Sequence, residues 1–148
     1  MKAIIYLGMV VAMMMAFEVR AWDDFERSGV DVSSWYNESD ATPSEWQVFT
    51  SLGHGRSKSL IITEKTLKVG KTIVAVTQKI QNKTNTPYCL IAKISEEVNA
   101  INTLKRHGLT IILPGEEKFI GGYRINTMGR NWKVHWKFKG TKNLNLCD

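Results

Sequence analysis

The sequence predicts a mainly β protein, built as a single antiparallel β-sandwich of about seven to eight strands with one short crossover helix near 95–107. Three observations support this prediction. From Trp46 onward, short β-type runs alternate with turn signals. The stretch GRNWKVHWKFKG, residues 129–140, alternates apolar residues with cations, which is the period of a strand with one buried face. No internal repeat or interdomain linker divides the chain of 148 residues, a length that suits one domain.

Residues 1–21 are predicted to be a signal peptide. Lys2 precedes an almost purely apolar run at 3–17, and the sequence VRA at 19–21 fits cleavage after Ala21. An apolar run of about 15 residues is shorter than the roughly 20 that a membrane-spanning helix needs. We therefore expect a secreted protein, periplasmic or extracellular, with no transmembrane segment in the mature chain.

Charge is distributed unevenly along the chain, whose formal net charge is +6. Segment 22–45 holds seven acidic residues and one arginine, whereas 46–148 holds seventeen basic and six acidic residues. We expect 22–45 to be an acidic, irregular lead-in to a β-sandwich domain at 46–148, and its aromatic residues favour docking over full solvation. A basic protein of this kind suggests either an anionic partner or a lead-in folded back on its own domain.

Strands follow one another closely after the lead-in. Gly70-Lys71 suits a two-residue hairpin turn, Pro114-Gly115 suits the centre of a type II turn, and Gly121-Gly122 within a strand indicates a bulge or a close backbone approach. Runs of β-branched, aromatic and alternating apolar residues predict strands at 46–49, 60–63, 66–69, 72–81, 88–94, 109–113, 119–125 and 132–138, and Leu144 and Leu146 could form the inward row of a final short one at 144–146.

Segment 95–107, SEEVNAINTLKRH, interrupts the β pattern and predicts a helix of about three turns. Ser95 is a favourable N-cap, two glutamates follow it, basic residues occupy 105–107, and Gly108 stands at the position after the helix. Its narrow apolar stripe is Val98, Ile101 and Leu104. A helix here would cross from one strand to the next.

The run of short strands, the Pro114-Gly115 turn and the late tryptophan-rich strand together resemble immunoglobulin-like modules of exported proteins. This resemblance implies a sandwich of two sheets. It implies no particular activity, because one fold hosts many functions.

Two kinds of covalent modification are expected. Cys89 and Cys147 are the two cysteines of the chain, and an even pair in an exported protein predicts a disulfide. Closing a loop of this length stabilises a fold by about 4 kcal/mol in the chain-entropy model. Asn37 and Asn82 begin N-x-S/T triplets, which are glycosylation acceptors if the source is eukaryotic.

The cationic row of 129–140 is the main candidate binding site. Rings and cations lie on opposite faces of the predicted strand, whereas platforms for single-stranded nucleic acid need both on one exposed face. We expect the aromatic row to be buried and the cations to form a solvated face that also protects a sheet edge. With the glycine-rich loop at 53–59, the candidate anion- or partner-binding residues are Arg56, Lys58, Lys133, His135, Lys137 and Lys139.

Signals for catalysis or metal binding are weak. His54, His107 and His135 are far apart in the sequence and show no HxH or HExxH spacing. There is no GxSxG stretch and no CxxC pair. We expect no cofactor, no metal and no enzymatic activity.

These observations favour an exported, non-catalytic binding or accessory protein that engages a protein partner through loops or a sheet edge. The first alternative is a polyanion-binding protein whose basic face takes an anionic glycan, lipopolysaccharide or nucleic acid of the envelope or matrix. The second alternative is a small secreted hydrolase with a site assembled from distant residues.

Overall fold

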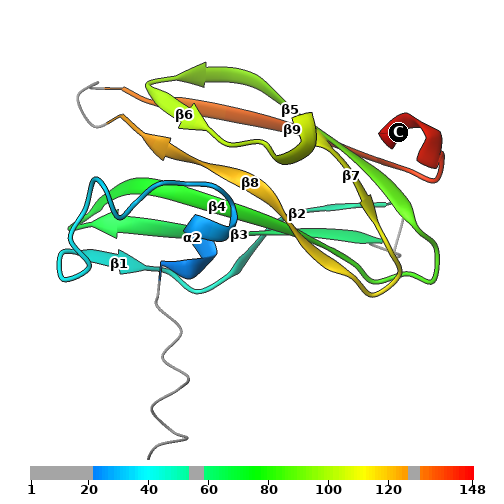
Figure 1. Cartoon of the computed structure of the whole chain (residues 1–148), viewed down its shortest axis with the longest axis horizontal. Coiled ribbons are helices and arrows are strands. Elements are labelled where there is room, and N and C mark those ends of the chain that lie inside the picture. The colour runs from blue at the N-terminus through cyan, green and yellow to red at the C-terminus, as the bar shows by residue number, and fades with distance from the viewer. Residues whose placement is uncertain (1–21, 54–58, 127–130) are drawn as a thin grey trace, which may run out of the picture.

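The computed structural model describes residues 22–53, 59–126 and 131–148, which form two antiparallel sheets in two layers (Figure 1). Sheet A has the order β1-β3-β4-β8-β6, with β2 also paired to β3, and sheet B has the order β7-β5-β9. The predicted β-sandwich is confirmed. The strands of the described ranges are β1 (Ala41–Pro43), β2 (Gln47–Leu52), β3 (Leu60–Val69), β4 (Thr72–Asn82), β5 (Tyr88–Val98), β6 (Ala100–Asn102), β7 (Leu109–Ile112), β8 (Glu117–Ile125) and β9 (Lys133–Thr141).

The immunoglobulin likeness extends to the two-sheet architecture but not to the strand order. In an immunoglobulin domain, one sheet contains the first, second, fifth and fourth of seven strands, in that order. If β3 is counted as the first of seven strands, the corresponding order in sheet A is β3, β4, β8 and β6, that is, first, second, sixth and fourth. The sixth strand therefore stands where an immunoglobulin domain has its fifth. As a result, β5 is the central strand of sheet B, between β7 and β9.

The helix predicted near 95–107 is wrong, because most of this segment is extended. Strand β5 continues to Val98 in sheet B, Asn99 bends the chain with a φ of 51°, and β6 joins sheet A. Glu96 and Glu97 pair with residues of β9, and the Ser95 hydroxyl donates to the His135 carbonyl at 3.2 Å. Helix caps act locally, whereas these ladder bonds come from a strand forty residues away, and they override the local preference.

The core between the sheets consists of two clusters of buried side chains. Trp136 of β9 packs against both clusters, and Phe138 packs against the larger one. The larger cluster is Leu60, Ile62, Ile80, Leu90, Ala92, Ile112 and Ile120. The smaller cluster is Val76, Tyr123 and Ile125.

A second hydrophobic core lies on the face of sheet A that points away from sheet B, where the N-terminal segment covers it. Phe25, in helix α2 (Asp23–Arg27), is fully buried there, and Asp24 forms a 2.9 Å ion pair with Lys65 of β3. The buried members of this core are Trp22, Phe25, Val30, Val32, Ala41, Leu67, Val74 and Ala75. The lead-in therefore folds back on its own domain, and it contains α2 and β1, which we had expected to be irregular.

The C-terminal residues pack on sheet B. A 3-10 turn, η3 (Leu144–Cys147), contacts β5 and β7, and the predicted disulfide joins Cys89 to Cys147. The turn replaces the short strand expected at 144–146, because the Asn143 side chain accepts a hydrogen bond from the Asn145 amide and caps it. None of the helices in the described ranges is long and apolar enough to cross a membrane.

Two glycines let segments of the sandwich approach closely. Gly121 has a φ of +141°, and a Cβ there would lie 2.1 Å from the Thr103 carbonyl oxygen. A Cβ on Gly122 would lie 2.2 Å from the Val76 carbonyl oxygen. The pairing of β4 with β8 shifts register beside them, so this stretch shows both the bulge and the close approach that the Gly-Gly pair predicts.

A carboxyl group lies beside a buried amide in the centre of sheet A. Glu64 of β3 is opposite Gln78 of β4, whose side chain is 1% exposed. Burial raises the pKa of Glu64, and its hydrogen bond with Gln78 offsets part of that rise. Gln78 Oε1 has no hydrogen-bond partner within the described residues. A protonated Glu64 can donate to an acceptor of this kind, whereas an ionised one cannot.

We expect Glu64→Gln to raise the melting temperature by a few degrees at pH 7. Because the pKa of Glu64 is higher in the folded protein than its ordinary value of 4.5, the protonated side chain favours folding at a pH below 4.5. This stabilisation is lost as the pH rises through the pKa of the folded state. The uncharged amide removes that loss, so the two proteins should converge in stability near pH 4. Thermal melts from pH 4 to 8 test this, with the exposed Glu45→Gln as control. A constant difference across this range would contradict the explanation.

Candidate anion-binding face

Strand β9 presents its cations to solvent, as its sequence predicts. Lys133, His135, Lys137 and Lys139 are exposed and alternate with partly buried residues. Trp136 and Phe138 stack on each other at 5.8 Å between ring centroids and pack into the core. Trp132 departs from the prediction: it directly precedes β9 and is 39% exposed, although its ring lies 6.1 Å from that of Tyr123 in β8.

Glu96 neutralises one end of the cationic row. Its carboxylate lies 2.9 Å from Lys133 Nζ and 3.3 Å from His135 Nδ1. The side chains of Lys133 and His135 are at least half exposed, so these contacts contribute little stability. The carboxylate does reduce the positive charge that Lys133 presents to a partner.

The opposite end of the row gains a cation from the neighbouring strand. Lys93 of β5 is directly opposite Lys137, and Lys139 is the next outward residue of β9. We call Lys93, Lys137 and Lys139 the lysine triad. Within the described ranges, no carboxylate forms an ion pair with any of the three. The alternation of residues 88–94 predicts that Lys93 lies on an outer face. Its position beside Lys137 depends on the register between β5 and β9, which the sequence pattern does not show.

A hollow of about 600 Å³ adjoins the triad where β9 ends. Lys139 and Lys142 contribute cations to it, and Phe138 and Tyr88 contribute rings. Gly53 and Ser59, which flank the loop with Arg56 and Lys58, also line it. Arg56 and Lys58 lie outside the described residues. Of the other four candidate binding residues, Lys137 and Lys139 belong to the lysine triad, whereas Lys133 and His135 lie beside Glu96.

The described histidines lie apart from one another. His135 has Glu96 as a neighbour, but it is 58% exposed on the strand face and does not line the hollow at the end of β9. His107 lies in the turn η2 (Lys105–Gly108), and His54 is outside the described residues. No group of three or more potential metal ligands occurs in the described part of the chain.

The two glycosylation candidates differ in accessibility. Asn37 is exposed. Asn82 is fully buried, and its Nδ2 donates to the carbonyls of Thr86 and Ile112 at 2.8 and 3.1 Å. In the folded protein the Asn82 nitrogen that would hold a glycan is enclosed and hydrogen-bonded, which disfavours a glycan there, and glycosylation of either residue stays a prediction.

Comparison with known proteins finds no family model, no curated protein and no solved structure that matches this chain. The functional conclusions below therefore rest on the residues and their geometry.

Proposed function

We propose that this protein is an exported, non-catalytic binding protein whose lysine triad binds an anionic glycan. The observation that supports the proposal is the placement of Lys93 directly opposite Lys137, next to Lys139, without a paired carboxylate in the described ranges. Like charges directly opposite each other destabilise a sheet. A surface that keeps them together is suited to a ligand of opposite charge.

A glycan fits this face better than single-stranded nucleic acid does. Trp136 and Phe138, which alternate with these lysines, are packed into the core and cannot stack on bases. Sulfate or carboxylate groups of a polysaccharide require only cations and hydrogen-bond donors. Export is supported by the Cys89–Cys147 disulfide, since such bonds persist in oxidising compartments, and by the apolar run at 3–17.

We expect the double variant Lys93→Ala/Lys137→Ala to bind immobilised heparin, a sulfated glycan, about tenfold more weakly than wild type, which corresponds to roughly 1.4 kcal/mol. Wild-type binding should weaken steeply as salt is added, because exposed charges are screened. The matched control is Lys68→Ala/Lys71→Ala, which removes two exposed lysines from the β3–β4 hairpin. An equal loss in both variants would show that net charge alone binds heparin, and retention that ignores salt would exclude the proposal.

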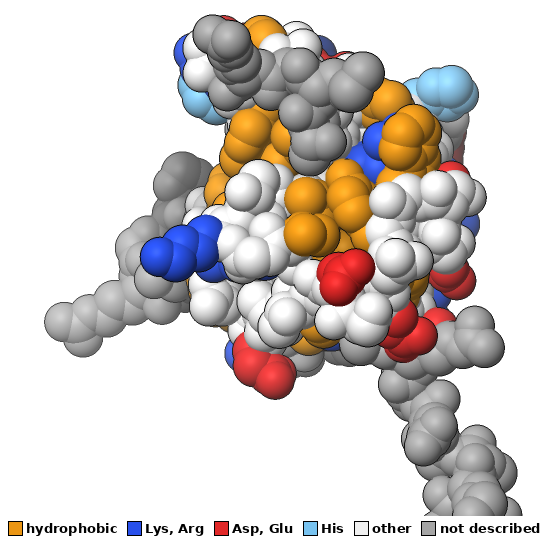
Figure 2. All heavy atoms as spheres, turned by 90° about the vertical axis from the view of Figure 1, so that its left-hand side faces the viewer, with side chains coloured by type: hydrophobic (Ala, Val, Ile, Leu, Met, Phe, Trp, Pro, Cys, Tyr) orange, Lys and Arg blue, Asp and Glu red, His pale blue; other side chains and the backbone are white. Residues whose placement is uncertain are grey.

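A protein partner is the second candidate, and exposed apolar residues at one end of the sandwich favour it. Trp35 is 60% exposed, and the Arg124 guanidinium lies 4.0 Å from the centre of its ring. Arg124 of β8 pairs with Ile101 of β6, which is 53% exposed. Val98 and Trp132 are exposed at the same end, where β5 turns into β6 and β9 begins (Figures 1 and 2). Tryptophan and arginine are enriched in the energetic centres of protein interfaces. Capture of a partner that survives high salt and is lost in Trp35→Ala would favour this candidate over the glycan.

A further inference from the structure

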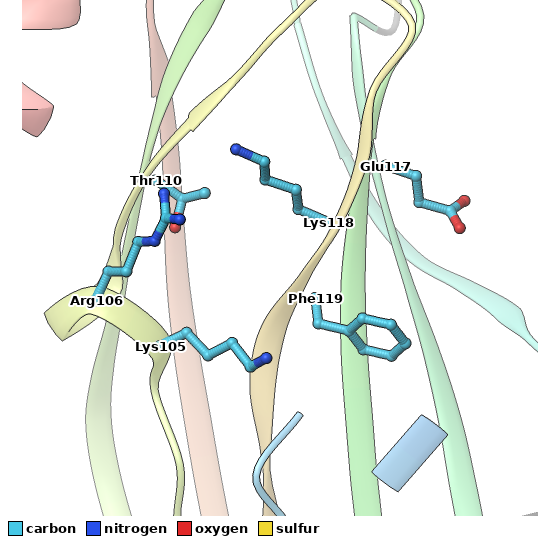
Figure 3. A pocket seen from close by; sticks show the side chains of 6 residues that line it. All are labelled: Lys105, Arg106, Thr110, Glu117, Lys118 and Phe119. Atoms are coloured by element: carbon cyan, nitrogen blue, oxygen red, sulfur yellow. The ribbon is translucent and has the colours of Figure 1, made fainter. Parts of the chain in front are cut away.

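A small basic pocket lies at the opposite edge of sheet B from β9. It has a volume of about 300 Å³ and lies between the turn η2, strand β7 of sheet B and strand β8 of sheet A (Figure 3). The lining residues are Lys105, Arg106, Thr110, Glu117, Lys118 and Phe119. Its size is at the lower limit of small-molecule sites.

Positive charge exceeds negative charge around this pocket. Lys118 is offset by Glu116 at 3.3 Å and donates to the Ile111 carbonyl at 2.9 Å. The carboxylate of Glu117 points away from the pocket and pairs with Lys79 at 2.9 Å (Figure 3). Lys105 and Arg106 form no ion pair within 4.0 Å among the described residues.

Glu116 is the acid that faces these cations from the turn before β8. The hydrogen bond from the Leu113 amide, at 2.8 Å, holds the pKa of Glu116 below its ordinary value, and Lys118 and Arg106 contribute to that lowering. Glu116 thus stays ionised and remains associated with Lys118. One carboxylate faces three cations, which leaves the pocket with an excess of positive charge.

Thr110 gives the pocket a polar group without a partner. The residue is 5% exposed, and its hydroxyl makes no hydrogen bond to any described residue. In Figure 3 the hydroxyl lies on the same side of the pocket as the Arg106 guanidinium. The hydroxyl is not one of the enclosed, unpartnered polar atoms of the described residues, so it remains accessible from the pocket and can donate to a ligand oxygen.

The backbone holds Arg106 over the pocket in an uncommon conformation. Arg106 and His107 have left-handed φ values of 51° and 55°, and Gly108 follows at 81°. Such a conformation costs roughly 1–2 kcal/mol for each residue with a Cβ. Gly108 cannot be replaced easily, since a Cβ there would lie 2.0 Å from the Ala92 carbonyl oxygen. The close contact between the turn and β5 therefore fixes the position from which Arg106 reaches the pocket.

We propose that this pocket binds a tetrahedral oxyanion, phosphate or sulfate, as the free ion or as the head of a small ester. Arg106 offers a planar fork for two oxygens, Lys105 adds a second charge, and Thr110 adds a hydroxyl donor. Phe119 also lines the pocket, and its ring lies 5.9 Å from Lys105 Nζ. The site shares no residue with the lysine triad, so it does not depend on glycan binding.

Amide chemical shifts of the full mature chain, titrated at constant ionic strength with sodium phosphate, sodium sulfate or glucose 6-phosphate, test this proposal. We expect saturable shifts at Thr110 and Lys118 with at least one of the three. Stronger binding of glucose 6-phosphate than of phosphate would identify the ester as the ligand, and the reverse order would identify the free ion. Sodium chloride and glucose serve as controls and should give no saturable change. Linear, non-saturating shifts with all three anions would overturn the proposal.

Variants locate the site. Lys105→Ala/Arg106→Asn should weaken oxyanion binding by at least about tenfold, and asparagine tolerates the left-handed backbone at 106. Thr110→Val removes only the hydroxyl and should weaken binding roughly fivefold. Lys93→Ala/Lys137→Ala should leave it unchanged, which separates this site from the glycan proposal. Unchanged affinity in folded Lys105→Ala/Arg106→Asn would overturn the assignment.

Discussion

Replacing both Cys89 and Cys147 with alanine is expected to lower the free energy of unfolding by about 4 kcal/mol. The disulfide spans 58 residues, and in its absence the unfolded chain gains the freedom of that loop. The same bond holds η3 against β5 and β7, so the turn should also detach. Urea denaturation of the oxidised wild type and the double variant measures the difference.

Wild type in a reducing agent is the control for this experiment, and it should unfold at the same urea concentration as the alanine variant. Agreement between them assigns the loss to the covalent bond and not to the new side chains. A difference of less than about 1 kcal/mol between oxidised wild type and variant, a quarter of the chain-entropy value, would mean that η3 and sheet B hold together without it.

Phe25→Ala is expected to destabilise the protein by about 3–5 kcal/mol, the usual cost of removing a buried phenylalanine. Phe25 is fully buried between helix α2 and sheet A, in the core that also holds Val30, Val32 and Leu67. Trp35→Ala is the matched control, because Trp35 belongs to the same segment but is 60% exposed. It should cost less than about 1 kcal/mol.

Hydrogen exchange extends the test of Phe25 to the sheet beneath it. Loss of the N-terminal cover should speed amide exchange in β3 and β4 more than in β5 and β9, because Leu67 and Ala75 form the floor of this core. Equal destabilisation by Phe25→Ala and Trp35→Ala would show that residues 22–36 are only loosely attached to the domain.

Features that depend on neighbouring residues could be predicted from the sequence. The alternation of β9 separates exposed cations from packed rings, and the two-residue hairpin joins Val69 to Thr72. The predicted Pro114-Gly115 turn forms and is closed by a hydrogen bond from the Glu116 amide to the Leu113 carbonyl, at 3.0 Å. In each case the signal and the structure lie within a few residues of each other.

Features that depend on pairing between distant strands could not be predicted in this way. The segment from Ser95 has good helix caps, but it pairs with β9 and β8 instead. No pattern among neighbouring residues shows that these two strands lie beside it. Lys93 joins Lys137 only through the register of β5 with β9. The basic pocket combines a turn with strands of both sheets, whereas the local pattern at 105–107 indicates only the end of a helix, and that helix does not form.

The position of β5 in the middle of sheet B has a consequence for biosynthesis. Both of its neighbours, β7 and β9, come later in the chain, and β4 likewise waits for β8. While the polypeptide emerges from the ribosome, the β3–β4 hairpin can form, but β5 gains its first ladder partner only when β7 (Leu109–Ile112) has followed and its second only when β9 (Lys133–Thr141) has followed. Such a nascent chain exposes an apolar strand prone to aggregation, and we expect the yield of folded protein to depend on holding chaperones more than on the stability of the finished fold.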